Sequence, residues 1–410
     1  MSKIEELMQQ YCPEGVEFVR LGDAFDMRNG YTPSKSNREF WDGGTIPWLR
    51  MEDIRQNGNI LGDAIQHVTP KAIKGKGLFK PNSIIMATTA TIGEHAMLIA
   101  DSLANQRFTN FSIRESLRDR LCPKFVFYYF FVIDEWCKRN VNVSSFPSVE
   151  MERLKNLEIP LPPIPVQEEI VRMLDTFTTL QAKLQAELQA RRLQYNYYRD
   201  KLLDVEGRMK GVERKRLGEV CAYAKERIDA ALMNEDNYVS VENLLPNQRG
   251  KERATNIPHE GHCTKFGPDD ILVGNIRPYL RKIWHADRVG GTNGDVLCIR
   301  IKDDAQGIIM PRYLYCILSS HSFFEYDNNH AKGAKMPRGD KQKIMDYEFQ
   351  LPPLPEQRRI VGFLDRFDAL VNDLSRGLPA EIGARRQQYE HYRDRLLTFK
   401  RKEEKEERGL

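Results

Sequence analysis

The sequence lacks the patterns that mark secreted and membrane proteins. Its seven cysteines are scattered without a CxxC pair, which is typical of a reduced cytosolic protein rather than of a disulfide framework. No apolar stretch near the start has the form of a signal peptide. The longest apolar run, residues 125–133, is too short to span a bilayer. We therefore expect a cytoplasmic protein.

Motifs for catalysis and cofactor binding are also missing. There is no GxxxxGK[ST] phosphate loop, no glycine-rich strand–turn–helix suited to a nucleotide or a methyl donor, and no [DNS]PP[YF] stretch. The nearest approach to a metal cluster is His259, His262 and Cys263, which have no second ligand pair at a zinc-like spacing. We interpret that segment as a polar loop. These absences predict a non-catalytic chain without a metal or cofactor of its own.

What is present has the composition of a globular protein. The 410 residues are enough for two or more domains, and 41% of them are hydrophobic while 29% are charged. The formal net charge is only +4. If the partner is a nucleic acid, the positive charge must therefore be clustered rather than spread over the surface.

The most informative feature is an internal repeat. Residues 161–177, LPPIPVQEEIVRMLDTF, return at 351–367 as LPPLPEQRRIVGFLDRF, with ten of seventeen positions identical. Residues 190–203 return at 384–397, with ten of fourteen identical and an offset that is four residues longer. The chain therefore consists of two halves with the same plan, in which a globule is followed by a helix.

Each repeated block is predicted to lie on a long helix. Apolar residues recur at alternating steps of three and four for about five heptads in the first copy. The last proline of its LPPIP segment suits the first turn of a helix from about 165 to 203. In the second copy, four added residues shift the register, and GLP at 377–379 should kink or interrupt the helix.

A single apolar stripe on a helix usually faces only a core, but two matching helices at the ends of duplicated halves favour pairing with each other. We predict an antiparallel coiled coil. The predicted packing residues are Ile170, Leu174, Phe177, Leu184, Leu188, Tyr195, Tyr198, Leu202, Ile360, Leu364, Phe367, Val371, Leu374, Ile382, Tyr389, Tyr392 and Leu396.

The two globules combine short strands with aromatic helices. Strands are predicted at 83–87, 96–99, 270–273, 281–285 and 296–301, and equivalent helices at 121–136 and 309–326. The predicted fold class is α+β, with two α/β domains joined by two long antiparallel helices in a pseudo-twofold internal repeat.

Positive charge gathers in loops of both globules. Lys and Arg neutralise phosphates, while Arg, Asn, Gln and Thr can read base edges in a groove. Any one of these loops, taken alone, is better explained as ordinary solvated surface. The predicted DNA-binding residues are Arg28, Lys35, Arg38, Lys74, Lys76, Thr88 and Thr89 in the first globule and Lys251, Arg253, Asn275, Arg277, Arg281, Lys335 and Arg338 in the second.

The paired proline-rich entries, the two QY–YRD–LL helix ends and the RLGD and RLGE segments at 20–23 and 216–219 resemble the specificity subunit (HsdS) of type I restriction–modification enzymes. The resemblance covers the whole chain and is strongest to the type IC branch. It implies target recognition domain 1 at 1–160, a central conserved helix at 161–205, target recognition domain 2 at 206–350 and a C-terminal conserved helix at 351–405.

The resemblance also implies a function. Each recognition domain would contact one half of a bipartite, asymmetric DNA target, and the helix pair would fix the gap between the halves. Two modification (HsdM) subunits would bring S-adenosylmethionine and adenine-N6 methylation, and two restriction (HsdR) subunits would add cleavage that depends on ATP and Mg. Exposed helix faces would bind the modification subunits, although surface salt bridging explains the same residues equally well. These candidates are Gln167, Arg192, Arg199, Asp200, Gln357, Arg386, Arg393 and Asp394.

Two other interpretations stay open from the sequence. The chain could be the DNA-recognition part of a self-contained methyltransferase or nuclease, which would require donor-binding and catalytic motifs in this same chain. It could also be a coiled-coil scaffold without a role in nucleic-acid binding, against which the basic loops argue. Binding of S-adenosylmethionine by the chain alone would favour the first, and salt-dependent duplex binding would exclude the second.

Overall fold

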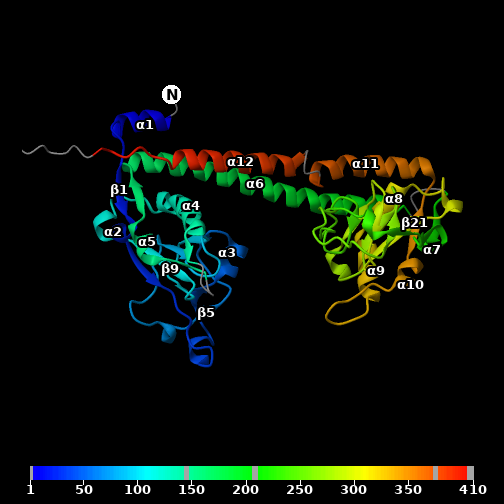
Figure 1. Ribbon diagram of the computed structural model, residues 1–410, viewed down its shortest axis with the longest axis horizontal. Coiled ribbons are helices and arrows are strands. Elements are labelled where there is room, and N and C mark those ends of the chain that lie inside the picture. The colour runs from blue at the N-terminus through cyan, green and yellow to red at the C-terminus, as the bar shows by residue number, and fades with distance from the viewer. Residues whose placement is uncertain (1–2, 143–146, 206–210, 373–376, 404–410) are drawn as a thin grey trace, which may run out of the picture. The chain divides into compact units, whose positions relative to one another are not determined.

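The structure is a computed structural model that describes residues 3–142, 147–205, 211–372 and 377–403. The chain divides into two compact units. Unit 1 comprises Met1–Ala182 and Ala384–Leu410, and unit 2 comprises Lys183–Gly383. Each unit therefore contains one globule together with segments of the long helices from both halves of the sequence (Figure 1).

A five-stranded sheet forms the centre of unit 1, in the order β2-β9-β6-β7-β4. Its strands are β2 (Phe25–Asn29), β9 (Phe108–Ile113), β6 (Ile84–Ala87), β7 (His95–Leu98) and β4 (Ile60–Leu61). Neighbours pair antiparallel except β4 and β7, which are parallel. Strands β6 and β7 are buried along their whole length, as short, continuous apolar runs predict.

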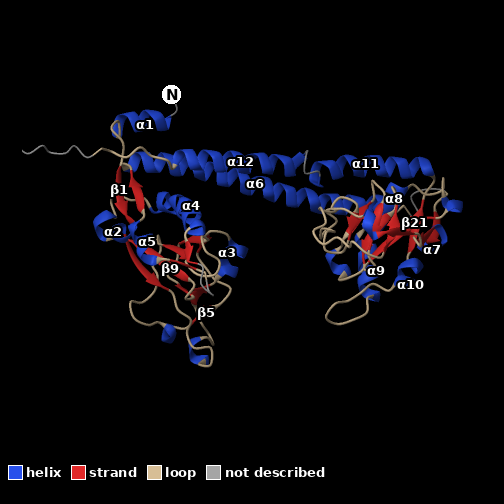
Figure 2. Cartoon of the chain, viewed as in Figure 1, coloured by secondary structure: helices blue, strands red, loops and turns tan. Residues whose placement is uncertain are grey.

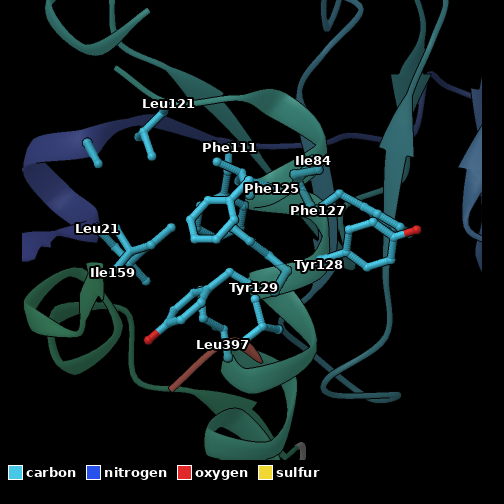
Figure 3. Close-up of a cluster of buried hydrophobic side chains, with 14 of the residues drawn as sticks. Leu21, Ile84, Phe111, Leu121, Phe125, Phe127, Tyr128, Tyr129, Ile159 and Leu397 are labelled. Carbon is cyan, nitrogen blue, oxygen red and sulfur yellow. The ribbon is translucent and has the colours of Figure 1, made fainter. Parts of the chain in front are cut away.

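The helix α4 (Pro123–Arg139) packs on this sheet through its aromatic side chains. Phe130 meets Phe25 and Phe111 edge to face, with ring centroids 5.9 and 5.1 Å apart. Figure 3 shows Phe125 and Tyr129 of α4 in the same cluster, with Leu397 beside Tyr129. This core therefore combines the first globule with the end of the last helix.

Smaller elements complete unit 1. They are α1 (Lys3–Tyr11), β1 (Glu17–Arg20), α2 (Leu21–Ala24), β3 (Ile46–Leu49), α3 (Met51–Asn57), β5 (His67–Val68), β8 (Leu103–Ala104), β10 (Val141–Asn142), β11 (Ser148–Val149), α5 (Met151–Asn156) and β12 (Glu158–Leu161). Strand β1 pairs antiparallel with β12, which brings the start of the globule to the entry of the first long helix.

Unit 2 repeats this plan with a four-stranded sheet in the order β14-β21-β18-β19. Its strands are β14 (Cys221–Tyr223), β21 (Val296–Ile301), β18 (Ile271–Gly274) and β19 (Ile283–His285). In the hydrogen-bonding order they match β2, β9, β6 and β7 of unit 1. In each unit the strands gather together and helices lie against them (Figure 2).

The other elements of unit 2 follow the first half only in part, because the second sheet has four strands in unit 2 and three in unit 1. They are β13 (Glu213–Arg216), α7 (Leu217–Val220), β15 (Arg227–Asp229), β16 (Tyr238–Val239), β17 (His262–Phe266), β20 (Gly290–Thr292), α8 (Pro311–Leu318), α9 (His321–His330), α10 (Lys341–Asp346) and β22 (Glu348–Leu351). Strand β13 pairs with β22, as β1 pairs with β12.

All five predicted strands are present, with ends shifted by at most two residues. The single helix predicted at 309–326 is wrong, because α8 ends at Leu318 and α9 begins at His321. The hydroxyl of Ser320 accepts a hydrogen bond from the Phe323 backbone N–H at 3.1 Å and so caps α9. A serine in this position favours a new helix start over continuation.

Three helices contain the repeated segments: α6 (Ile164–Leu203), α11 (Leu354–Asn372) and α12 (Gly377–Leu396). The 40 residues of α6 correspond to about 60 Å of helix at 1.5 Å per residue. The segment GLP at 377–379, where an interruption was predicted, forms the first turn of α12, and residues 373–376 before it lie outside the described residues. The helix α12 begins at Gly377, whose φ of 68° lies in the left-handed region.

Aromatic rings connect the two copies within each unit. In unit 1, Phe177 stacks on Tyr392 with ring centroids 5.5 Å apart. In unit 2, Tyr195 meets Phe367 at 5.7 Å and Tyr198 meets Phe363 at 6.3 Å. Later residues of α6 therefore contact earlier residues of α11, so the helices run antiparallel.

The structure gives the exposure of all but one of the predicted packing residues. The buried ones are Ile170, Leu174, Leu184, Leu188, Tyr195, Ile360, Leu364, Val371 and Tyr389, and the half-buried ones are Phe177, Leu202, Phe367, Ile382, Tyr392 and Leu396. Tyr198 is 40% exposed. Leu374 lies outside the described residues.

Candidate nucleic-acid interface

Two equivalent turns follow the central strands of the two sheets. Turn 1, residues 88–93, connects β6 to β7, and turn 2, residues 275–281, connects β18 to β19. The backbone N–H of Ala87 donates to the Glu94 carbonyl at 2.8 Å, and that of Gly274 donates to the Lys282 carbonyl at 2.9 Å. The two turns are therefore closed in the same way, although turn 2 is one residue longer.

Turn 1 is anchored at its first residue. The Thr88 hydroxyl is buried 2.9 Å from the Thr109 hydroxyl, and the Thr88 carbonyl accepts a hydrogen bond from the Val149 N–H at 2.9 Å. Two residues further on, Ala90 has a φ of 66° and donates its N–H to the Pro147 carbonyl at 3.2 Å. The turn thus lies against the segment that leads into α5.

Turn 2 has the same anchors. The carbonyl of buried Asn275 accepts a hydrogen bond from the Gly339 N–H at 3.1 Å, and Arg277 donates its N–H to the Pro337 carbonyl at 2.7 Å. Arg277 has a φ of 52°. A left-handed backbone is uncommon outside glycine, asparagine and aspartate, and turn 2 contains a second case at Arg281, with a φ of 51°.

Burial contradicts two of the predicted DNA contacts, and a third side chain is hydrogen-bonded within the chain. Thr88 and Asn275 are only 6% and 5% exposed, so their side chains cannot reach a duplex. The guanidinium of Arg28 donates to the carbonyls of Gly77 and Leu78. The side chains of Thr88 and Arg28 thus form hydrogen bonds within the chain, a role that residue type alone does not distinguish from a contact with DNA.

The other predicted residues of unit 1 lie at the surface. Lys35, Arg38, Lys74 and Lys76 are exposed, and Thr89 is half-buried and forms a β-bridge with Ser148. The Lys74 ammonium lies over the ring of Tyr31, 6.0 Å from its centroid. Lys35, Arg38 and Lys76 form no ion pair with any residue in the described part of the chain. Their charges are therefore available to a polyanion.

Most predicted cations of unit 2 already have partners. Arg253 pairs with Glu235 and Asp236 at 3.0 and 3.2 Å. Lys251 is half-buried over Trp284, and desolvation lowers the pKa of its ammonium. Nη2 of Arg281 lies 3.0 Å from Nδ1 of His321.

The basic segment before α10 differs between its two predicted residues. Arg338 forms an ion pair with Asp295 at 3.1 Å. Lys335 is exposed, as is Arg277 in turn 2. Neither of these two side chains makes an ion pair within residues 3–142, 147–205, 211–372 and 377–403. Of the basic side chains predicted in unit 2, these two are the most available for DNA.

Two residues beside the turns were not predicted. Arg107 is exposed, and its backbone carbonyl accepts a hydrogen bond from the Thr88 N–H at 3.0 Å, which places it next to turn 1. Tyr279 is 53% exposed in turn 2. Asp295 takes the equivalent place in unit 2, because its carbonyl accepts a hydrogen bond from the Asn275 N–H. No strand was predicted after Arg107, so no signal in the sequence indicated this residue.

The prediction that Gln167 and Gln357 lie on exposed helix faces is wrong, because both are completely buried. The Gln167 side chain accepts from the Cys122 N–H at 2.8 Å and donates to the Pro162 and Arg120 carbonyls at 2.6 and 2.7 Å. The Gln357 amide makes the equivalent three bonds in unit 2. The repeated glutamine thus joins each proline-rich segment to its globule.

Arg199 is a second correction among the predicted partner contacts. It is 1% exposed, and its Nη1 donates to the Gln248 amide oxygen at 2.6 Å. The equivalent Arg393 is half-buried and pairs with Asp394 at 2.8 Å. Arg386 and Asp394 are exposed, and Arg192 and Asp200 are half-buried. These five other residues stay candidates for a partner interface.

Metal ligands and reactive thiols are common parts of catalytic sites. No set of three or more His, Cys, Asp or Glu side chains among the described residues could hold a metal ion. Burial raises the pKa of the Cys137, Cys221 and Cys316 thiols to about 12, so these thiols are protonated and poor nucleophiles at neutral pH. Within those residues, no helix combines the length and apolar character that a membrane span requires.

Comparison with known proteins agrees with this arrangement. The type I restriction modification DNA specificity domain matches residues 13–190 and again 209–384. The specificity subunit of the type I restriction enzyme EcoprrI from Escherichia coli is 36% identical over 410 residues, covering 92% of each chain. The EcoR124I/EcoR124II specificity subunit, also from Escherichia coli, is 31% identical over 270 residues, which is 61% of this chain and 64% of that one.

A solved structure supports the fold. A chain described in connection with complex assembly and conformational transition of the type I R-M system matches with a TM-score of 0.60 at 17% identity, covering 93% of this chain and 97% of that chain. The fold defines a chain of two related α+β units, each with one anchored turn. The chain belongs to the family of type I restriction–modification specificity subunits. It is thus a non-catalytic subunit that supplies DNA specificity to a complex whose other subunits carry out the chemistry.

Proposed function

We propose that unit 1 and unit 2 each read one half of a bipartite, asymmetric DNA target. The observation that carries this proposal is the repetition of one sheet order and one anchored turn in both units with different side chains at the tips. A shared frame supports the same kind of contact with DNA, and different side chains support different base sequences. The recognition domains would be residues 1–160 and 206–350.

The long helices would set the gap between the two half-sites. This part of the proposal is supported by the 40-residue length of α6 and its aromatic contacts with both later helices. About 60 Å of helix exceeds the roughly 34 Å that separates half-sites one helical turn apart. A paired helix has a defined length, whereas the ends of a flexible linker would fluctuate in distance.

The repeated helix ends would bind the catalytic partners, two modification (HsdM) and two restriction (HsdR) subunits. Two copies of one motif are expected where two copies of one partner bind. The candidate contacts are Arg386, Arg393 and Asp394 in unit 1 and Arg192 and Asp200 in unit 2. Leu193 and Tyr197, 71% and 59% exposed on α6, add apolar surface of the kind found at interfaces. The partners would supply S-adenosylmethionine, ATP and Mg, and the complex would act in the cytoplasm.

Methylation mapping tests this function. The chain would be co-expressed with a type I modification subunit that it binds, and modified adenines would be mapped across the host genome. We expect one motif with two different half-sites separated by a single gap length. A continuous motif, or two identical half-sites, would contradict the proposal.

A DNA-binding assay gives an independent test. Binding of the assembled complex to a duplex should weaken steeply with salt, because each phosphate contact releases counterions. The chain alone should not bind S-adenosylmethionine. Saturable binding by the lone chain would instead favour a self-contained enzyme.

A further inference from the structure

The two turns share a backbone frame that the sequence repeat does not reveal. In each turn the first residue is buried and the third has a left-handed backbone. In each, the N–H of that third residue donates to a proline carbonyl, Pro147 or Pro337. In each, the second residue forms an antiparallel bridge to the residue after that proline. Because the bridge includes that N–H to carbonyl bond, three independent features make Ala90 equivalent to Arg277.

The frames are the same but the tips are chemically different. Ala90 is exposed between two half-buried threonines, Thr89 and Thr91, so turn 1 presents methyl and hydroxyl groups. Turn 2 presents the exposed side chains of Arg277 and Tyr279. No described residue pairs with the Arg277 guanidinium. One unit thus offers a free planar cation where the other offers a small neutral surface.

The backbone conformation of these residues also requires an explanation. Neither alanine nor arginine favours a positive φ, and asparagine or glycine would adopt it more easily. Such strained residues are often found at binding sites, where surrounding hydrogen bonds hold them in place. In both units the left-handed residue is held by its bond to the proline carbonyl, and the turn is closed by the backbone bond from Ala87 to Glu94 or from Gly274 to Lys282.

We propose that the left-handed residue of each turn, Ala90 in unit 1 and Arg277 in unit 2, is a specificity-determining residue for its half-site. This inference rests on the proposed function and refines it to individual side chains. Arg277 reads guanine, because a guanidinium can donate two hydrogen bonds to O6 and N7 in the major groove. Turn 1 has no guanidinium at the equivalent residue, Ala90. Its methyl groups suit contact with a thymine methyl, and its hydroxyl groups can form single hydrogen bonds to base edges.

The frame residues have a different role. Asn275 and Gly339 position turn 2, and a Cβ atom on Gly339 would lie 2.4 Å from an Asp327 carboxylate oxygen. These residues do not reach the surface. Their substitution would therefore alter the placement of the turn rather than its preference for a base.

The test uses the complete chain with its modification subunit, and it maps methylation and measures duplex binding against salt for four variants, two at Arg277, one at Lys335 and one at Ala90. Arg277→Asn removes the guanidinium but retains a residue that tolerates a positive φ. Arg277→Lys keeps the charge and loses the planar fork. Lys335→Gln, which removes an exposed cation of unit 2 that lies outside the turn, is the matched control. Thermal unfolding of each complex confirms that the variants are folded.

We expect both Arg277 variants to lose roughly 5- to 150-fold discrimination at one guanine of one half-site, the range for a bidentate base contact. The other half-site and the gap should not change. Lys335→Gln should weaken binding to all duplexes alike and reduce the salt slope by about one. The reciprocal variant Ala90→Asn should alter only the half-site that Arg277 does not affect.

The opposite results would overturn the inference. If Arg277→Asn behaves like Lys335→Gln and weakens every duplex equally, Arg277 contacts phosphate and does not determine specificity. If a variant changes both half-sites, the turns do not read separate halves. If the wild-type complex methylates no bipartite motif, the proposed function fails as well, so the two failures are distinguishable.

Discussion

Replacement of Gln167, a polar residue in the first turns of α6, should destabilise unit 1. The side chain is fully buried and makes three hydrogen bonds of 2.6–2.8 Å, one from the Cys122 N–H and two to the Arg120 and Pro162 carbonyls. Gln167→Ala removes all three and leaves the Cys122 N–H, which lies at a partly buried position, without this acceptor.

The size of the effect follows from these bonds. A buried donor without a partner costs roughly 1–3 kcal/mol, and each of the other two lost bonds costs about 1 kcal/mol. We expect Gln167→Ala to lower the free energy of unfolding by about 3–5 kcal/mol. That loss is a large part of the roughly 5–15 kcal/mol that stabilises a typical protein.

A second substitution at this residue tests the direction of the bonds. In Gln167→Glu the carboxylate still accepts from Cys122, but its second oxygen faces two carbonyl oxygens. The folded state should therefore raise the pKa of this glutamate above its unfolded value, and the stability of the variant should fall as the pH rises through that folded-state pKa. Its deficit should shrink at acid pH, where the protonated side chain can donate one bond.

Urea-induced unfolding followed by circular dichroism measures these changes. Gln185→Ala is the matched control, because Gln185 is an exposed residue of the same helix, and it should change stability by less than about 0.5 kcal/mol. Equal effects of Gln167→Ala and Gln185→Ala would refute the buried hydrogen-bond network.

Three further predictions concern stability. Burial raises the pKa of Asp327 to about 6, above the usual value near 3.9. The free energy of unfolding of unit 2 should therefore fall by on the order of 3 kcal/mol as the pH rises from about 4 to 6. Asp327→Asn should abolish this pH dependence in urea unfolding, and a variant that keeps it would contradict the prediction. Leu174→Ala in the core should lower the free energy of unfolding by about 3–5 kcal/mol. Leu193→Ala, on an exposed part of the same helix, should lower it little in the same assay. Similar losses for the two variants would contradict the burial of Leu174. Gly377→Ala should lower the thermal midpoint, because its Cβ would lie 2.5 Å from the Leu370 carbonyl oxygen at a φ of 68°; an unchanged midpoint would show that this helix start is not constrained.

The fold could be predicted largely from the sequence because its signals are local or repeated. The apolar steps predicted a helix from about 165 to 203, and α6 runs from Ile164 to Leu203. Continuous apolar runs predicted the central strands, as for β21, whose ends agree with the prediction. The division between α8 and α9 was missed because one serine, Ser320, decides it through a single capping bond.

The candidate site was less predictable because it depends on contacts between distant residues. Arg28 donates to carbonyls about fifty residues away, and the equivalence of Ala90 and Arg277 depends on backbone bonds to two prolines. For Gln167 a signal was present. It precedes Ile170 by three residues and Leu174 by seven, which places it on the buried side of the helix. A repeated polar residue on an apolar stripe indicates a buried hydrogen bond.

The claim that the paired helices set the gap is tested most directly by lengthening them. Seven residues, one heptad, would be inserted after Ala182 in α6 and after Gly383 in α12, and methylation would be mapped in the complex with its modification subunit. One heptad adds about 10 Å of helix, or about three base pairs of duplex at 3.4 Å each. We predict the same two half-sites with a gap about three base pairs longer. A folded, active variant that keeps the original gap would contradict the account.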